Sequence, residues 1–583
     1  MTTRETTSEK PAKGAAPKTS GTGKGHEPSE AAADRTGLDA MLTNAAVGPG
    51  RMRPGLETLQ VMAQLARRPQ LPVRTSLALT KDLAQIAVGR SEVAPDKKDK
   101  RFADPAWTDN PLYSRACKSY LATSAALEEL VAQLDLDWKT RKRARFLLDN
   151  LIDAASPSNS PLNPMALKVA LDTGGKSLVR GVRNAAHDLS RRPHIPAMVD
   201  TEPFNVGENI AVTQGAVVLR TPTIELIQYR PRTEKVHATP LLLVPPMINK
   251  FYVADLAPDR SMVQHFLDSG QPVFVISWRN PGAEQRDWTF DTYVQAVLDA
   301  LEATRQISES GSAHVLGLCA GGITASSTLA YLAANGRQEE VASLTLGVTV
   351  LDQHHAGTVG SFIDESNAQA AIAQSQRQGY LDGRSLAGVF AWLRPNDLIW
   401  NYWVNNYLLG KRPPAFDVLF WNNDVTRMAA GLHRDFIQMA VHNTLVTPGE
   451  TIVLGTPIDL SAITVDSYVV AGIADHITPW HNCYRTVNLL GSQPRFVLST
   501  NGHIAALVNP PGNAKSSYRI NDKLPKDPDA WLEGASSHPG SWWDDWTAWV
   551  AARSGGEKDA PAELGSEQYP AGVPAPGEYV FET

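Results

Sequence analysis

The chain has 583 residues, a net charge of −6 at pH 7 and three cysteines. That length allows two or more domains, or one large core with insertions. The slightly negative net charge lacks the excess of basic residues that is typical of nucleic-acid-binding proteins. Three cysteines are too few, and odd in number, for a disulfide framework, so we expect a reducing compartment. The polar N-terminus and the lack of a long apolar stretch predict a soluble protein with no secretory signal and no membrane span.

The first part of the chain changes character near residue 37. Residues 1–36 have almost no large apolar side chains, so they cannot offset their ordering entropy and we expect a disordered tail. From 37 to 200, apolar residues recur at helical spacing, for example over 139–152, which predicts an N-terminal helical domain. Proline-containing breaks at 101–107 and 156–164 separate the helices.

Residues 201–352 have the pattern of an α/β fold. Two β-branched runs, 216–220 and 224–229, are parted by Thr221-Pro222-Thr223, which predicts a hairpin. Apolar runs then alternate with helical stretches, which indicates a parallel sheet with helices on both faces. The expected strands of that sheet are Leu241–Val244, Val273–Trp278, Val315–Leu318, Leu344–Leu351, Ser467–Gly472 and Phe496–Leu498.

Residues 353–445 interrupt the alternation with a helical, aromatic-rich segment, which we interpret as a cap inserted into the sheet domain. The cap is either an ordinary helical lid that fills out the core or a gate that excludes water from the site. The sheet domain resumes over 446–583. Near its end, Trp542, Trp546 and Trp549 share one helical face, and we favour packing on the core over contact with a membrane or a polymer.

Cys319 is the candidate nucleophile. It follows the apolar run ending at Leu318 and precedes Ala320-Gly321-Gly322 and a helical pattern. This is the context of the nucleophile elbow G-x-S-x-G, with cysteine in the serine position. Glycines allow the sharp turn, and the N-terminus of the following helix favours a thiolate and an oxyanion. The alternative is a buried cysteine beside a tight turn.

The order of an α/β-hydrolase triad is nucleophile, acid, histidine. Asp475 follows the expected strand 467–472, and His503 follows the expected strand 496–498. Both therefore stand where the acid and the base of such a triad belong. His476 is a competing base, but it adjoins the acid and would reach Cys319 less easily.

Several further segments resemble polyhydroxyalkanoate synthases, the polymerases of bacterial storage polyester. Together they span most of residues 100–555. The matching segments are Arg101–Trp107, Ser156–Pro164, Val244–Asp255, Ser277–Pro281, Gly317–Gly322, Arg394–Gly410, Phe420–Asp424, Gly472–Trp480 and Gly502–Pro511. The residues of these segments are most similar to the single-chain, Pseudomonas-like (class II) branch, which typically takes medium-chain monomers. Membership of the class I branch remains an alternative.

The resemblance implies an α/β-hydrolase fold with an inserted helical cap and an N-terminal helical domain. It also implies an acyltransferase that polymerises (R)-3-hydroxyacyl-CoA and releases CoA, with no metal and no cofactor beyond the CoA of its substrate. The implied partners are the growing polyester chain, the granule surface, granule-associated proteins and a second copy in a homodimer. The implied location is the cytoplasm, at the granule surface.

The thioester substrate explains why the nucleophile is a cysteine and not a serine. Attack by the Cys319 thiolate exchanges one thioester for another, so the acyl group stays activated, whereas a serine ester would lose that activation. His503 is expected to act as the base. Asp475 either orients His503 or helps to deprotonate the 3-hydroxyl group of the next monomer, and the sequence leaves both roles open.

The expected oxyanion donors are backbone N–H groups. One belongs to Ala320, and a second to the loop after strand 241–244, at Met247 or Ile248. Further along this loop stand Asn249, Lys250 and Tyr252, and we slightly favour a role in shaping the loop over contact with CoA.

Two other functions compete with polymerisation. A cysteine hydrolase of the dienelactone-hydrolase kind also has G-x-C-x-G, but such enzymes are shorter and lack the N-terminal domain and the long cap. A non-catalytic granule-coating protein would not need an elbow, an acid and a histidine in triad order.

Overall fold

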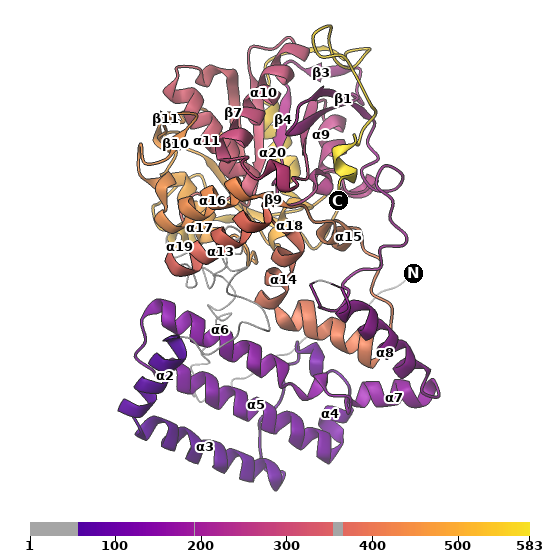
Figure 1. Cartoon of the computed structure of the whole chain (residues 1–583), viewed down its shortest axis with the longest axis vertical. Coiled ribbons are helices and arrows are strands. Elements are labelled where there is room, and N and C mark those ends of the chain that lie inside the picture. The colour runs from indigo at the N-terminus through magenta and orange to yellow at the C-terminus, as the bar shows by residue number, and fades with distance from the viewer. Residues whose placement is uncertain (1–55, 192, 354–364) are drawn as a thin grey trace, which may run out of the picture.

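The computed structural model describes residues 56–191, 193–353 and 365–583. The tail predicted over residues 1–36 lies outside these described residues. Figure 1 shows a layered α/β body above and a helical body below it, with helix α14 of the cap between them.

The lower body consists of α-helices, as the apolar spacing predicted. Two of its longer helices begin at capping side chains: Asn110 accepts from the backbone N–H of Leu112 before α5, and Asp137 accepts from that of Thr140 before α6. The helices are α2 (Leu56–Arg67), α3 (Gln70–Ala87), α4 (Ala106–Asp109), α5 (Pro111–Ala132), α6 (Trp138–Ala154), α7 (Pro164–Asp172) and α8 (Lys176–Leu189).

The upper body contains a ten-stranded mixed sheet. Its six central strands, from β5 to β13, are parallel, as predicted, and the two strands at each edge are antiparallel. In spatial order the strands are β1 (Gly215–Arg220), β2 (Ile224–Tyr229), β5 (Val273–Trp278), β4 (Leu241–Val244), β6 (Ala313–Leu318), β7 (Val341–Gly347), β12 (Ser467–Gly472), β13 (Arg495–Ser499), β14 (Ser517–Ile520) and β15 (Ser536–Pro539).

The ten-stranded sheet differs from the sequence prediction in two main details. The strand expected over Leu344–Leu351 ends at Gly347, because Val348 has a φ of 46°, which does not continue a strand. The apolar residues 350 and 351 are buried in the following loop instead. The antiparallel pair β14–β15 was not predicted, since its half-exposed polar residues lack an apolar alternation.

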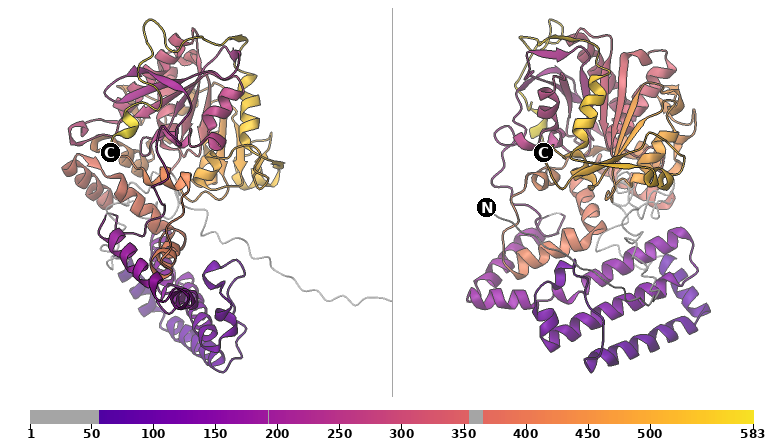
Figure 2. Two further views of the ribbon diagram at one scale, coloured as in Figure 1. Left: turned by 90° about the vertical axis from the view of Figure 1, so that its right-hand side faces the viewer. Right: turned by 180° about the vertical axis from the view of Figure 1, so that it is seen from behind.

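Helices cover both faces of the sheet. In β4, Leu241 and Leu243 belong to the cluster on one face, and Leu242 and Val244 to the cluster on the other. The first cluster is covered by α9 (Met262–Asp268), α18 (His503–Leu507) and α20 (Trp542–Ala551), and α20 is visible in gold across the back of the sheet in Figure 2. The second is covered by α10 (Phe290–Ile307), α11 (Ala320–Ala334), α17 (Trp480–Arg485) and α19 (Pro528–Glu533).

The cap is mainly helical but includes a small antiparallel pair of strands, β8 with β9, which the sequence did not predict. Gly379, with a φ of 88°, lies between the first cap helix and β8. The cap elements are α13 (Glu365–Gln378), β8 (Tyr380–Leu381), α14 (Gly383–Leu393), η8 (Asn396–Trp400), η9 (Trp403–Leu408), α15 (Asp417–Asn423), β9 (Met428–Ala429) and α16 (Ala430–His442).

The helical body packs on the cap through α8 and η9. A Cβ atom at Gly181 of α8 would lie 1.8 Å from the carbonyl oxygen of Tyr407. The Tyr407 hydroxyl donates to Asp188 at 3.0 Å, and the Trp403 indole N–H donates to the Asn159 carbonyl at 3.2 Å. The two segments thus approach backbone to backbone, which only glycine permits at position 181.

Gly181→Ala is expected to lower the thermal unfolding midpoint. Alanine is favoured over glycine inside a helix by about 1 kcal/mol, but this Cβ would force α8 away from η9, and such overpacking costs about 1–3 kcal/mol. Differential scanning calorimetry of the full chain measures the change. Val182→Ala, at a side chain 71% exposed on the same helix, is the control. A midpoint that rises in Gly181→Ala would show that α8 does not lie against η9.

Candidate active site

Cys319 occupies a strained turn between β6 and α11. Its backbone has φ 51° and ψ −120°, a conformation that non-glycine residues adopt only where the surroundings impose it. The Cys319 N–H donates to the carbonyl of Gly347 at 2.8 Å, which fixes the turn to the neighbouring strand β7. A half-buried side chain on such a strand-to-helix turn has the geometry expected of a nucleophile elbow.

The glycines after Cys319 permit close packing. A Cβ at Gly321 would lie 2.3 Å from the carbonyl oxygen of Val244 and 2.6 Å from that of Pro245. A Cβ at Gly322 would lie 2.1 Å from the Thr349 hydroxyl oxygen. The first turn of α11 therefore lies directly against the end of β4, where the expected oxyanion loop begins.

Asp475 and His503 are joined by a hydrogen bond. His503 Nδ1 lies 2.7 Å from Asp475 Oδ2. The same carboxylate oxygen accepts from the Thr478 hydroxyl at 2.6 Å, while Oδ1 accepts from the backbone N–H groups of Ile477 and Thr478 at 2.8 and 2.9 Å. Both oxygens of Asp475 are therefore engaged, and both side chains are buried. Because β6, β7, β12 and β13 are parallel neighbours, all three triad candidates lie at the same edge of the sheet.

Electrostatics link His503 to both partners. Burial alone would lower the pKa of His503, but the charges of Asp475 and Cys319 and a hydrogen bond to each outweigh it and raise that pKa to about 10. Burial alone would raise the pKa of Asp475, but the charge of His503 and the hydrogen bonds lower it below its ordinary value. The imidazolium form of His503 is thus favoured beside Asp475, where it stabilises a neighbouring thiolate.

The other two cysteines are unsuited to nucleophilic chemistry. Cys117 and Cys483 are 1% and 0% exposed. Burial raises the pKa of Cys117 to about 11 and that of Cys483 well above its ordinary value. Since the thiolate is the nucleophile, both stay inert near neutral pH. Cys319 alone of the three cysteines combines partial exposure with a histidine partner.

The expected oxyanion donors lie beside the elbow. Ala320 is the first residue of α11, so its N–H has no acceptor inside the helix. Met247 and Ile248 are buried in the same apolar cluster as Ala320. Within the described parts of the chain, neither the Met247 nor the Ile248 backbone N–H has a hydrogen-bond acceptor. These N–H groups are therefore available to a developing oxyanion.

The remaining loop candidates have contacts within the protein. Lys250 donates to the carbonyl of Glu582 at 2.5 Å, and the Tyr252 hydroxyl donates to Asp424 at 2.7 Å. Both side chains are buried, so these contacts favour the loop-shaping role over contact with CoA. Asn249 is half-buried and forms a β-bridge with Val425.

His476 is half-buried next to Asp475 in the chain. The histidine that hydrogen-bonds the Asp475 carboxylate is His503, which favours His503 as the base.

Two tryptophans support the histidine helix, a role that the sequence did not reveal. The indole N–H of Trp542 donates to the carbonyl of Ala506 at 2.6 Å, and that of Trp543 to the carbonyl of Leu507 at 3.0 Å. These are the last two carbonyls of α18, which begins at His503, and the Leu507 carbonyl also accepts from the backbone N–H of Asn509 at 3.0 Å. The core-packing interpretation of the terminal tryptophan helix is confirmed, and the only local signal was that a buried indole needs an acceptor.

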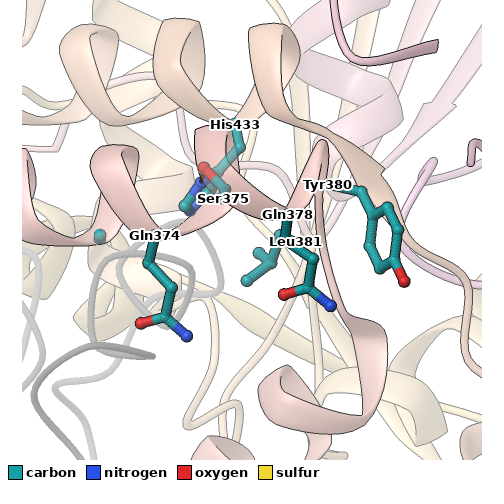
Figure 3. Close-up of a pocket in the computed structure, with 7 residues that line it drawn as sticks. Gln374, Ser375, Gln378, Tyr380, Leu381 and His433 are labelled. Carbon is teal, nitrogen blue, oxygen red and sulfur yellow. Dashed lines mark hydrogen bonds between the residues drawn. The ribbon is translucent and has the colours of Figure 1, made fainter. Parts of the chain in front are cut away.

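A small cavity lies inside the cap, away from the triad residues. Figure 3 shows His433 of α16 next to Ser375 of α13, and their hydrogen bond measures 2.8 Å. The cavity encloses about 10 Å³, room for one water at most, so it cannot hold a substrate. Within residues 56–191, 193–353 and 365–583, no group of three His, Cys, Asp or Glu side chains could bind a metal. No helix in those same ranges is long and apolar enough to cross a membrane.

Comparison with known proteins relates about nine tenths of the chain to one group. Residues 98–266 match the family of the poly-beta-hydroxybutyrate polymerase (PhaC) N-terminus, and residues 240–510 match the alpha/beta hydrolase fold. Poly(3-hydroxyalkanoate) polymerase 2 from Ectopseudomonas oleovorans is 47% identical over 532 residues, 91% of this chain and 95% of that protein.

Two further relatives have nearly the same coverage of the chain. Poly(3-hydroxyalkanoate) polymerase 1 from Ectopseudomonas oleovorans is 45% identical, over 90% of this chain and 93% of that protein. The poly(3-hydroxyalkanoate) polymerase subunit PhaC from Cupriavidus necator is 42% identical, over 90% of both chains. With this identity along nearly its whole length, on an α/β-hydrolase fold, the chain belongs to the poly(3-hydroxyalkanoate) polymerase family.

Proposed function

We propose that this enzyme polymerises (R)-3-hydroxyacyl-CoA into polyester and releases CoA, with Cys319 as the residue that carries the acyl group. One observation carries the proposal: a cysteine occupies the elbow of a poly(3-hydroxyalkanoate) polymerase relative, beside a buried histidine that is bound to an aspartate. A thiolate at that position transfers a thioester without losing its activation.

In the acylation step, the Cys319 thiolate attacks the carbonyl carbon of the CoA thioester. The new carbon–sulfur bond forms to Cys319, the bond to the CoA sulfur breaks, and the departing thiolate takes a proton from His503. The oxyanion formed in between accepts hydrogen bonds from Ala320 and from the loop after β4.

In the elongation step, the 3-hydroxyl oxygen of one acyl unit attacks the thioester carbonyl of another. An ester bond forms, the carbon–sulfur bond breaks, and the hydroxyl proton passes to His503. Asp475 is the orienting residue here, because both of its carboxylate oxygens already accept hydrogen bonds within the protein. The inserted cap acts as a gate that excludes water, the competing nucleophile at every turnover.

The family suggests where the enzyme works. We place it in the cytoplasm at the surface of polyester granules, as a homodimer beside granule-associated proteins. Cross-linking of the full chain in the presence and absence of polymer tests the dimer.

Turnover of purified enzyme distinguishes polymerase from hydrolase and from coat protein. With 3-hydroxydecanoyl-CoA and 3-hydroxybutyryl-CoA as parallel substrates, we expect CoA release accompanied by polymer. The better substrate identifies the branch, medium-chain or short-chain. CoA release with free 3-hydroxy acid as the sole product would support the hydrolase, and no CoA release from either substrate would support the coat protein.

A further inference from the structure

A short segment of the cap crosses the loop that follows β4. The loop, residues 245–252, leads from β4 into η4 (Phe251–Val253). The cap segment, residues 421–426, comprises the end of α15 and the residues directly after that helix. Asn249 and Val425 form an antiparallel bridge between the two.

Three side chains of the cap segment bind the loop. The Trp421 indole N–H donates to the Lys250 carbonyl at 2.7 Å, and the Thr426 hydroxyl donates to the Met247 carbonyl at 3.0 Å. Asp424 accepts from the Tyr252 hydroxyl at 2.7 Å. The loop is therefore bound near its start, its middle and its end by one piece of the cap.

The Thr426 contact determines the direction of one oxyanion donor. The carbonyl of Met247 and the N–H of Ile248 belong to the same planar peptide group and point in opposite directions. A carbonyl directed at Thr426 therefore directs the Ile248 N–H away from the cap segment. Ile248 lies in the same buried cluster as Ala320, which holds the other expected donor. This orientation favours Ile248 over Met247 as the second donor.

These contacts are shielded from water. Trp421, Thr426 and Tyr252 are 2%, 3% and 0% exposed. Burial raises the pKa of Asp424 and lowers that of Lys250, as expected of groups held out of solvent. A hydrogen bond lost here is not replaced by water, so the loop would lose its fixed position.

We infer that Thr426, Trp421 and Asp424 are positioning residues for the oxyanion hole, so that the peptide between Met247 and Ile248 is correctly directed only while this cap segment lies on the loop. The inference rests on the proposed function and extends it. The cap that excludes water also completes the oxyanion hole, so an enzyme with a displaced cap neither polymerises nor hydrolyses its acyl thioester.

The other side of the cap segment faces the helical body. Asn422, Asn423 and Val425 line a cavity of about 660 Å³ together with His187 of α8, Pro193 and residues 195–199. The cap segment therefore has the helical body on one side, across this cavity, and the loop after β4 on the other. Residues 420–424, one of the segments that resemble the family, thus lie between the helical body and the loop after β4.

Two inhibitors separate positioning of the oxyanion from general packing. The first is an aldehyde with the acyl part of the substrate. Addition of the Cys319 thiol to its carbonyl forms a hemithioacetal, with the thiol proton going to the carbonyl oxygen, and this adduct uses the oxyanion donors. The second is a CoA thioether in which a methylene group replaces the carbonyl, so it binds without an oxyanion.

Thr426→Val removes the hydroxyl at constant shape and is the decisive variant. We expect its inhibition constant for the aldehyde to rise about tenfold and its kcat to fall about tenfold. Deletion of an oxyanion donor lowers kcat by more, roughly 10²–10³-fold. The thioether constant and KM should change less than about twofold. Thr426→Ser keeps the hydroxyl and should have the wild-type aldehyde inhibition constant and kcat. Trp421→Phe removes the indole donor and should change these two quantities as Thr426→Val does, so it serves as the test variant if Thr426→Val does not fold. Trp403→Phe removes a comparable cap bond elsewhere and should leave the ratio of the two inhibition constants unchanged.

Equal weakening of both inhibitors in Thr426→Val, or no weakening of either, would overturn the inference. The wild-type enzyme tests the proposed function separately. If it releases CoA and forms polymer while the inhibitor ratio does not respond, only the positioning role fails. If it forms no adduct and releases no CoA, the proposed function itself fails.

Discussion

Cys319→Ala is expected to abolish CoA release from 3-hydroxyacyl-CoA while the protein keeps its fold. The side chain is small and half-buried, so its removal leaves little unfilled space, but no thiolate remains to accept the acyl group. CoA release followed with a thiol reagent gives the rate, and calorimetry gives the unfolding midpoint.

Cys117→Ala is the matched control, because its buried thiol takes no part in the chemistry and CoA release should continue. Cys319→Ser should be nearly as inactive as Cys319→Ala, since a hydroxyl is far less ionised than a thiol and an acyl-serine loses the thioester's activation. Polymerisation by Cys319→Ala near the wild-type rate would refute the assignment of the nucleophile.

His503→Gln and Asp475→Asn are the second pair with large expected effects. Glutamine at 503 removes the group that exchanges protons in both steps, a loss of about 10²–10⁴ in rate. Asparagine at 475 replaces an acceptor of the His503 Nδ1 proton by an amide, so the ring loses both its orientation and the charge that raises its pKa. Replacement of the aspartate of a catalytic triad by asparagine lowers kcat by up to about 10⁴-fold.

Rapid-quench measurement of the first CoA released shows which step fails. Because both oxygens of Asp475 are bound within the protein, we expect both variants to lose the initial burst and not only the later elongation. An Asp475→Asn enzyme that releases one CoA per site in a normal burst and then stalls would instead make Asp475 a base for the 3-hydroxyl group.

The sequence predicted the central sheet because its strands have strong local signals. Leu241–Val244, Val273–Trp278 and Ser467–Gly472 were predicted with the bounds that the structure has. The first two are short apolar runs bounded by polar or proline residues, and the third is a short, mainly apolar run that begins after Asp466 and ends at Gly472. The edge strands β14 and β15 were missed, because an edge strand that is half exposed lacks that pattern. The pair β8–β9 has two residues in each strand, too few for any periodicity.

The triad candidates followed from the order of elbow, acid and histidine along the chain. Their supporting contacts could not be predicted in the same way. The bond from Trp542 to the end of α18 and the bond from Thr426 to the loop after β4 join residues far apart in sequence. Neither has a local pattern, since both depend on how the tertiary fold brings an indole or a hydroxyl to a particular carbonyl.

The most direct test of this account is the mass of the Cys319 peptide from wild-type enzyme quenched during turnover. With 3-hydroxydecanoyl-CoA as substrate, we expect that peptide to carry one or more 3-hydroxydecanoyl units in thioester linkage, removable by hydroxylamine. Polymer that accumulates while the Cys319 peptide stays unmodified, with acyl groups on Cys117, Cys483 or no cysteine at all, would contradict the account.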